Sequence, residues 1–375
     1  MKILILTTRD LHNGPRMIRE INTLKNHFDL VAVGKSPPIE SQVKFISSET
    51  VFTIFERAIG MFYRFVTLNR GVITKYLSVQ VRINRLLREI EPTIIIVHDP
   101  FYLQYLFSRK QKTKVIFNAH EYHPKEQEAD LIWMRTWGEA YFKTYQKYLP
   151  KLALLINVNQ EIADQCENEF GVKSLVIPNA SQYNQAPKES WHYRKPLRFI
   201  HHGIPNPDRK LEVMIEAFRL LGKSFELDLM LVNNESEYYN FLKKEMANLS
   251  NVNLIPSVSF GEIIPFISQY DLGVYSLAPV SFNNRMALPN KFFEFIQARL
   301  PMIIGPSPVM SRYVLNYQIG KVADDFGAES LAAAIRSLSE EDVNNFRLNL
   351  EVAARELSME HFESELLKKV KEISE

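Results

Sequence analysis

Short, continuous apolar runs recur along the chain, and each is followed by a pattern typical of a helix. In the first half these runs are Ile3–Leu6, Leu30–Val33, Thr93–Val97, Lys114–Phe117, Leu152–Ile156 and Ser174–Ile177. Apolar strands without polar alternation are typical of parallel sheets that are buried on both faces. The sequence therefore predicts βαβ organisation, with ligand sites beyond the carboxyl ends of the strands.

The alternation is interrupted once and then resumes. Residues 183–196 are rich in polar and turn residues, including Pro187 and Pro196, and predict an inter-domain linker. The second series of strands is Leu197–Ile200, Leu227–Val232, Val252–Ile255, Leu272–Tyr275 and Pro301–Ile304. Because 375 residues is long for one domain, we predict two doubly wound α/β domains in tandem, residues 1–182 and 197–358.

Composition and cysteine usage restrict the compartment. The chain is 46% hydrophobic and 23% charged, as in globular proteins, and it has no apolar run of 18 residues that would span a membrane. The single cysteine, Cys166, excludes an internal disulfide and fits a reducing compartment. We therefore expect a cytoplasmic protein in which Cys166 contributes to packing.

The segment 51–90 departs from the strand–helix rhythm. Apolar residues recur at helical spacing from Phe52 to Val66, and seven basic residues are interleaved against only Glu56 and Glu89. One interpretation is a helical patch on an anionic membrane surface, which would place the protein peripherally at the inner membrane face. The other is a helix pair packed on the sheet with a solvated basic face, which is the more common use of an apolar stripe.

Polar residues follow the strands of the first half. The loop Arg9–Arg16 contains Gly14 directly before a helix, but it lacks the GxGxxG and GxxxxGK[ST] spacings, so we exclude dinucleotide and P-loop motifs. His98 and Asp99 end one strand, and residues 118–124 follow the next. The histidines and carboxylates there suggest a metal, yet no ligand spacing such as HExxH is present. We favour His120 as a residue that orients or deprotonates a substrate hydroxyl, and a histidine satisfied by a backbone carbonyl is the alternative.

Two stretches of the second half suggest an anion. Gly203 would let the backbone approach a ligand, and Arg209 and Lys210 are placed at the start of the next helix, where cations are unfavourable unless an anion binds. In Leu288–Phe295, Pro289 suits the first position of a helix. Asn290, Lys291 and Glu294 would share one face of it, opposite Phe292, Phe295 and Ile296. A helix start of this kind suits a diphosphate.

These residues resemble a known family. The run 288–295, followed by Gln297–Pro301, resembles the donor-site motif of GT-B glycosyltransferases, closest to the retaining GT4-type enzymes of bacterial polysaccharide and lipid-linked glycan assembly. Other landmarks agree in order and spacing: Ile156–Ile162, Val176–Ala180, Gly203 with Arg209, and the His120–Glu121 junction.

The resemblance implies a GT-B fold, with two Rossmann-like domains, an inter-domain cleft and a final helix, residues 359–375, that crosses back to the first domain. It implies that Glu294 binds the donor ribose. Gly203, Arg209, Lys210 and the amides around Asn290 and Lys291 would hold the diphosphate. His120 would lie near the transferred sugar, with Gly14, Arg16 and Glu121 on the acceptor side. It implies no metal and no cofactor, since cations and helix ends would offset the leaving-group charge.

The sequence departs from the family at one position. Many GT4 enzymes carry a first glutamate eight residues before the second, and here that position is Met286. We expect a glycosyltransferase that moves a sugar from a nucleotide-diphosphate donor to a glycan or lipid-linked acceptor, with no nucleic-acid partner. A nucleotide-sugar epimerase of the same fold and a non-catalytic nucleotide-binding scaffold are the alternatives.

Overall fold

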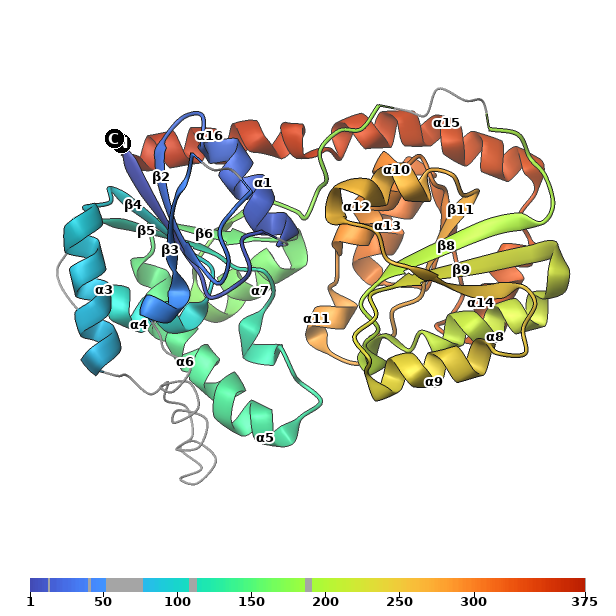
Figure 1. The fold of residues 1–375 in the computed structure, drawn as a ribbon, viewed down its shortest axis with the longest axis horizontal. Coiled ribbons are helices and arrows are strands. Elements are labelled where there is room, and N and C mark those ends of the chain that lie inside the picture. Colours follow the sequence, from blue (N-terminus) through green and yellow to red (C-terminus); the bar gives the residue numbers. More distant parts are fainter. Residues whose placement is uncertain (13, 40–41, 52–76, 108–112, 186–190, 375) are drawn as a thin grey trace. The chain divides into compact units, whose positions relative to one another are not determined.

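The computed structural model describes residues 1–12, 14–39, 42–51, 77–107, 113–185 and 191–374. The chain forms two compact units, whose elements Figure 1 labels. The first unit comprises residues 1–178, 281–283 and 362–375, and the second comprises residues 179–280 and 284–361. Two helices, α11 (Phe282–Arg285) and α16 (Met359–Ser374), have residues in both.

A seven-stranded parallel sheet forms the middle of the first unit, in the order β3-β2-β1-β4-β5-β6-β7. Its strands are β1 (Lys2–Leu6), β2 (Asp29–Gly34), β3 (Lys44–Ser47), β4 (Ile94–Val97), β5 (Lys114–Asn118), β6 (Leu154–Asn157) and β7 (Ser174–Val176). The order reverses between β1 and β4, where the loops at the carboxyl ends diverge and where doubly wound folds bind ligands.

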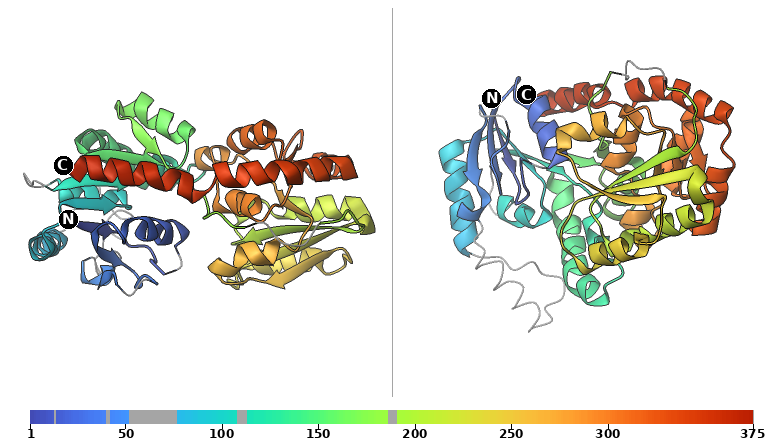
Figure 2. Two further views of the ribbon diagram at one scale, coloured as in Figure 1. Left: turned by 90° about the horizontal axis from the view of Figure 1, so that it is seen from above. Right: turned by 45° about the vertical axis from the view of Figure 1, so that its right-hand side comes forward.

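Helices cover both faces of this sheet (Figures 1 and 2). They are α1 (Pro15–Leu24), α3 (Leu77–Ile90), α4 (Leu103–Leu106), α6 (Glu139–Tyr148) and α7 (Gln160–Phe170), together with the end of α16, whereas the short α5 (Leu131–Trp133) has no buried residue. Pro15 opens α1, where its missing N–H costs no hydrogen bond, and Met17, Ile21 and Leu24 form the buried face of that helix. In α16, Glu363 accepts a hydrogen bond from Thr23 of α1.

The second unit repeats this architecture with six parallel strands in the order β10-β9-β8-β11-β12-β13. The strands are β8 (Leu197–Gly203), β9 (Phe225–Leu231), β10 (Val252–Pro256), β11 (Leu272–Tyr275), β12 (Met302–Ile304) and β13 (Gly320–Val322). The helices are α8 (Glu212–Leu221), α9 (Glu237–Met246), α10 (Ile263–Ile267), α12 (Asn290–Gln297), α13 (Pro308–Tyr317), α14 (Ala328–Arg336) and α15 (Glu340–Glu356). The order of this sheet reverses between β8 and β11.

The core of the second unit lies between its sheet and the helices α8, α9 and α14. Met214, Ile215 and Phe218 of α8 are buried against the strands, and the Phe218 ring packs edge-on against Phe199 of β8, with centroids 5.2 Å apart. Burying each such side chain contributes about 1.5–3 kcal/mol. This packing fixes β8, and with it the polar residues at the end of that strand.

The strand orders confirm the predicted doubly wound fold, and every predicted strand is present. The sequence missed β3 and β13. Each is short and contains a lysine, so neither shows the apolar run that identified the other strands.

The remaining predictions on chain organisation concern two segments. Residues 52–76 of the basic segment lie outside the described residues. The described part, α3, buries Val79, Ile83, Leu86 and Ile90, as the packed-helix interpretation predicts. In the predicted linker, Trp191 and Tyr193 pack against the core of the second unit. Among the described residues, no helix is long and apolar enough to cross a membrane.

Candidate active site

The loops after β1 and β4 are tied together where the order of the first sheet reverses. Thr7 Oγ1 donates a hydrogen bond to Asp99 Oδ2 (2.9 Å), and the backbone N–H of Thr8 donates to the same oxygen (2.7 Å). The Arg9 guanidinium lies 3.8 Å from the other oxygen of Asp99. Asp99 thus fixes the diverging loops at the expected ligand edge of the sheet.

A chain of three side chains runs from Glu20 through His98 to His120. His98, at the end of β4, is fully buried, and its Nε2 lies 2.9 Å from Oε1 of Glu20 on α1. The Nδ1 of His98 lies 3.0 Å from Nε2 of His120, which follows β5. Burial tends to raise the pKa of Glu20, but His98, Asn118 and Arg16 outweigh it, so the pKa lies below its usual value. Glu20 is therefore an anion that only accepts hydrogen bonds.

An ionised Glu20 requires a proton on Nε2 of His98. When His98 is neutral, its Nδ1 must accept from Nε2–H of His120, and Nδ1 of His120 then carries the lone pair of a base. If Nδ1 of His120 takes up a proton, transfer of its Nε2 proton to Nδ1 of His98 would reverse the hydrogen bond between the imidazoles and bring the positive charge next to Glu20. Burial, followed by Arg9 and Arg16, holds the pKa of His120 well below its usual value, so His120 is neutral at pH 7.

Asn118 and Arg16 support this chain from the side. The Asn118 amide donates to Glu20, and its Oδ1 accepts from Nε of Arg16 (2.9 Å). Arg16 is 8% exposed, and burial lowers its pKa to about 9. Gly14 precedes α1, where a Cβ would lie 2.5 Å from the carbonyl oxygen of Asp10. Arg16 thus contacts the chain through Asn118 and does not contact His120 directly in any interaction given above. Gly14 allows a close turn into α1.

The other residues of the segment 118–124 lie apart from that chain. Burial, followed by Glu126, raises the pKa of Glu121 to about 7. His123 is buried, with Nδ1 2.8 Å from the Tyr145 hydroxyl, and burial lowers its pKa to about 3. Of the histidines identified in the sequence, the structure therefore brings His98 and His120 together and places His123 elsewhere.

In the second unit, two cations converge on Gly203 at the end of β8. Gly203 has φ +134°, a region that favours glycine, and a Cβ there would lie 3.3 Å from Nζ of Lys291 and 3.5 Å from Nη1 of Arg209. Lys291, in the first turn of α12, is 6% exposed. We call Gly203, Arg209 and Lys291 the cation cradle.

The environment of Lys291 contains few groups that stabilise a charge. Nδ1–H of His201 donates to the Val274 carbonyl (3.0 Å), so its Nε2 accepts from Lys291 Nζ (3.0 Å). The ammonium also lies 4.4 Å from the centroid of the Tyr275 ring. Burial, followed by Arg209, lowers the pKa of Lys291 well below its usual value, with partial compensation from Glu294. An anion bound here would remove this penalty.

Glu294 and His202 form a second buried pair beside the cradle. The Glu294 carboxylate is 4% exposed and lies 3.3 Å from Nε2 of His202. The two groups are not aligned for a hydrogen bond, and Nε2 of His202 has no hydrogen-bond partner among the described residues. Burial, followed by Lys291, keeps the pKa of His202 well below its usual value. A buried polar atom without a partner costs about 1–3 kcal/mol, and a ligand hydroxyl would satisfy it.

Two local predictions for this region were wrong. Arg209 ends a short 3₁₀ turn and Lys210 adopts a left-handed conformation (φ 50°), so both precede α8, which begins at Glu212. Lys210 is exposed, and the cradle described above does not include it. The helix α12 begins at Asn290, with Pro289 as its N-cap, and residues 291–297 are all buried instead of forming one polar and one apolar face. The reason is that the polar face of α12 packs against β8 and β11.

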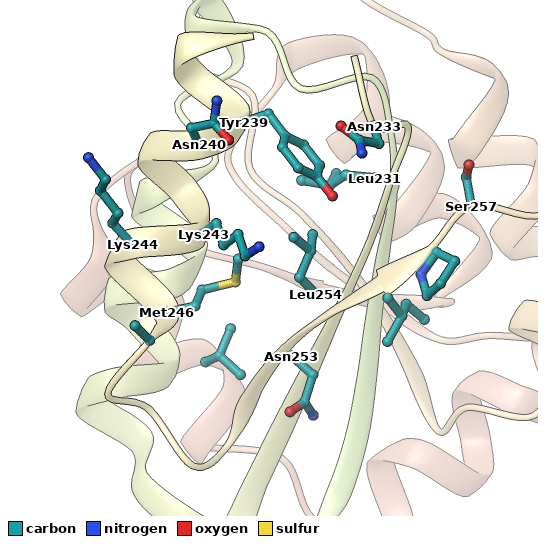
Figure 3. Close-up of a pocket in the computed structure, with 14 residues that line it drawn as sticks. Leu231, Asn233, Tyr239, Asn240, Lys243, Lys244, Met246, Asn253, Leu254 and Ser257 are labelled. Carbon is teal, nitrogen blue, oxygen red and sulfur yellow. The ribbon is translucent and has the colours of Figure 1, made fainter. Parts of the chain in front are cut away.

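The second unit also contains an open groove of about 1100 Å³ between α9 and the ends of β9 and β10 (Figure 3). Tyr239 and Lys243 extend from α9 toward Leu231 and Leu254, whereas Lys244 extends away from them. None of the residues singled out in the sequence lines this groove.

The sequence patterns assigned no functional role to Glu20, His201 or His202. Glu20 had a signal, since it is a carboxylate within the buried stripe of α1 formed by Met17, Ile21 and Leu24. Buried charged groups are rarely left unpaired, so this position suggested a partner across the sheet.

The fold and part of the sequence are similar to those of known glycosyltransferases. Sucrose-phosphate synthase from Thermosynechococcus elongatus superposes with a TM-score of 0.73 at 11% identity, covering 99% of this chain and 98% of that chain. HepE of Anabaena in complex with UDP-glucose gives a TM-score of 0.70 at 12% identity, covering 99% and 100%. TarM gives 0.69 at 13% identity, covering 98% of each chain. No curated relative matches the sequence.

These likenesses show the GT-B fold. Residues 16–181 also match Glycosyltransferase Family 4. The chain is a glycosyltransferase with the GT-B fold, and its first unit is similar to that family. In this glycosyltransferase the family match covers the unit that carries Glu20, His98 and His120, and the cation cradle belongs to the other unit.

Proposed function

We propose that this glycosyltransferase transfers a sugar from a nucleotide-diphosphate donor to a glycan or lipid-linked acceptor in the synthesis of a bacterial surface polysaccharide. We further propose that the reaction retains the anomeric configuration and uses neither a metal ion nor a cofactor at the diphosphate. The observation that carries the proposal is the convergence of Lys291 and Arg209 on Gly203.

The cradle suits the diphosphate of the donor. When the bond between the anomeric carbon and the diphosphate oxygen breaks, the departing diphosphate gains negative charge. Lys291 and Arg209 stabilise that charge directly, and the amino-terminal end of α12 adds a positive dipole, with no side-chain cap on its first turn. The side chains therefore supply the positive charge that a metal ion would otherwise provide.

The pair formed by Glu294 and His202 suits the donor ribose. Glu294 accepts from a ribose hydroxyl, and a second hydroxyl on the same ring meets Nε2 of His202. The described partners of His202 do not satisfy that nitrogen, which is why a diol fits better than a single hydroxyl. HepE, a protein with the same fold, binds UDP-glucose, which favours UDP as the nucleotide here.

On the acceptor side, we propose that Nδ1 of His120 accepts the proton of the attacking hydroxyl. The acceptor oxygen approaches the face of the sugar that the diphosphate leaves, so that the configuration is retained. It forms the new bond to the anomeric carbon as the bond to the diphosphate oxygen breaks, and the proton charges the chain of His120, His98 and Glu20. His98 and Glu20 are positioning residues in this proposal, because they act through His120.

The experiment is a thermal-shift screen of UDP-, GDP-, CMP- and dTDP-sugars with the full chain. A donor at one hundred times its dissociation constant adds about 2.7 kcal/mol to stability. We expect the UDP-sugars to stabilise the parent and to lose this effect in Lys291→Met. Stabilisation of both proteins by the same nucleotide would contradict the cradle.

Product analysis then separates the reaction classes. A transferase consumes the donor only with an acceptor, so the sugar appears in a larger glycan. An altered free sugar without acceptor would indicate an epimerase, and donor binding without turnover would indicate a scaffold.

We also propose that the basic segment 51–90 holds the protein on an anionic membrane surface, where a lipid-linked acceptor is found. On α3, Leu77 and Val81 are 79% and 55% exposed. Flotation with anionic vesicles should be lost when Arg57, Arg64 and Arg70 are neutralised. The matched control neutralises Lys210, Lys243 and Lys244 of the second unit. If the parent does not float, this proposal fails.

A further inference from the structure

A second cluster of ionisable groups lies directly after His120. Glu121, His123 and Glu126 each offer a ligand atom, and these atoms all lie within 4.8 Å of one another. The cluster forms because the 3₁₀ turn η3 (His123–Lys125) reverses the chain after β5, and the backbone N–H of Glu126 donates to the carbonyl of His123 (3.2 Å). The sequence spacing, Glu-x-His-x-x-Glu, belongs to none of the ligand motifs considered above.

His123 is held as a ligand would be. Its side chain is 2% exposed, and the Tyr145 hydroxyl occupies Nδ1. The other ring nitrogen, Nε2, is buried and has no hydrogen-bond partner among the described residues. Imidazole ligands of metals are typically oriented in this way, through a hydrogen bond on the nitrogen that does not bind the ion.

The charges around the cluster favour a cation. Two carboxylates this close repel each other unless a proton or a cation lies between them. Arg9, which acts on the charges of the cluster, lies 3.8 Å from Asp99, and Lys125 of η3 lies 3.8 Å from Glu128. Asn283, which belongs to the same unit, donates to Oε2 of Glu121 (3.2 Å) and restricts the orientation of that carboxylate.

We propose that Glu121, His123 and Glu126 bind a divalent transition-metal ion such as Zn²⁺. Metal–ligand bonds of about 2.0–2.2 Å require the ligand atoms to lie closer together, so binding would draw the two carboxylates toward His123. One imidazole and two carboxylates suit zinc, and the half-exposed Glu121 and Glu126 leave an entry path.

The ion would fix the turn that follows His120. It would link Glu121, the next residue along the chain, to the far end of η3, and so restrict the backbone that carries His120. This role is separate from the diphosphate, because the cation cradle is built by residues of the other unit. The proposed metal site can therefore be tested without any assumption about how the donor binds.

The experiment is titration of the metal-stripped, untagged full chain with ZnCl₂, followed by calorimetry. We expect one tight site in the parent, with a dissociation constant at least tenfold higher in Glu126→Gln, which keeps the shape of the side chain. Glu128→Gln is the matched control, because it removes a carboxylate from the same segment and should bind as the parent does.

Two results would overturn the proposal: a parent that binds no Zn²⁺ after stripping, or a Glu126→Gln variant that binds as tightly as the parent. His123→Gln provides a second test, in which loss of binding supports the site. Circular dichroism of the stripped proteins shows whether each variant is folded. If His123→Gln does not fold, Glu126→Gln alone decides the outcome.

Discussion

The carboxyl ends of the strands form one ligand edge in each sheet of this glycosyltransferase, and the two edges differ in the buried charge that they hold. At the first, a buried anion, Glu20, is surrounded by donors from His98 and Asn118, so its charge is stabilised within the unit. At the second, a buried cation, Lys291, has an imidazole nitrogen as its hydrogen-bond partner and a second cation, Arg209, nearby. The first edge is thus organised to hold a proton, whereas the second is organised to receive an anion.

The largest effect should follow from removing a cradle cation. We expect Lys291→Met to lower kcat by about 10²–10³-fold and to weaken binding of the nucleoside diphosphate, as for loss of a group that stabilises developing charge. Arg209→Met should have a similar effect. Lys210→Asn serves as the comparison, since asparagine tolerates the left-handed conformation at that position. Equal losses for Lys210 and Lys291, measured by steady-state kinetics, would contradict the assignment of the cradle.

The contrast in charge should be visible in stability without ligand. Glu20→Gln leaves Arg16 and the imidazole chain without their counter-charge, so we expect a loss of about 3 kcal/mol in unfolding free energy. Lys291→Met removes a charge that burial disfavours, so its stability should change by less than about 1 kcal/mol or increase. Denaturant titration of both variants measures the difference. A Lys291 variant that is as unstable as the Glu20 variant would refute the comparison.

The same two variants should differ in kinetics. We expect Glu20→Gln to lower kcat by about 10–100-fold with little change in donor affinity, because the amide no longer fixes the proton on His98. The pH profile of kcat should shift as well, which a purely structural role would not cause. Glu363→Gln is the control, since Glu363 is a carboxylate of the same unit that accepts from Thr23. An unchanged pH profile in Glu20→Gln would exclude the positioning role.

The smallest effects concern the pH dependence of stability. The buried His201 and His202 have native pKa values below their ordinary 6.5, so the unfolded state binds more protons below that pH and stability falls on acidification. In the metal-stripped protein Glu121 acts in the opposite sense: its pKa of about 7 lies above the ordinary 4.5, so its contribution is lost as pH rises through this window.

Thermal unfolding between pH 4.5 and 7.5 separates these contributions. We expect His202→Gln to flatten the loss on acidification and Glu121→Gln to steepen it, each by up to about 1.4 kcal/mol per pH unit. If both substitutions changed the slope of stability against pH in the same direction, the difference between the two edges would be contradicted.

Much of this architecture could be predicted from local patterns. The runs at Thr93–Val97 and Leu272–Tyr275 correspond to central strands, since only a strand buried on both faces tolerates unbroken apolar sequence. The edge strand β13 escaped detection because its three residues, Gly320–Val322, contain a glycine and a lysine and so form no apolar run. The residues Gly203, Arg209, Lys291 and His120 were found because each follows a strand or opens a helix, and the polar ends of parallel strands meet at one edge of a sheet.

The sequence by itself determined the alternation of strands and helices, the resemblance to glycosyltransferases and the segments that carry polar residues at the ligand edges. Only the tertiary structure decided which of those residues act together. Glu20 meets His98 across 78 positions and Lys291 meets His201 across 90. Such pairs are set by the packing of α1 and α12 on their sheets, and no local spacing encodes them. The same holds for the tautomer of His120, which depends on Glu20 through the intervening imidazole of His98.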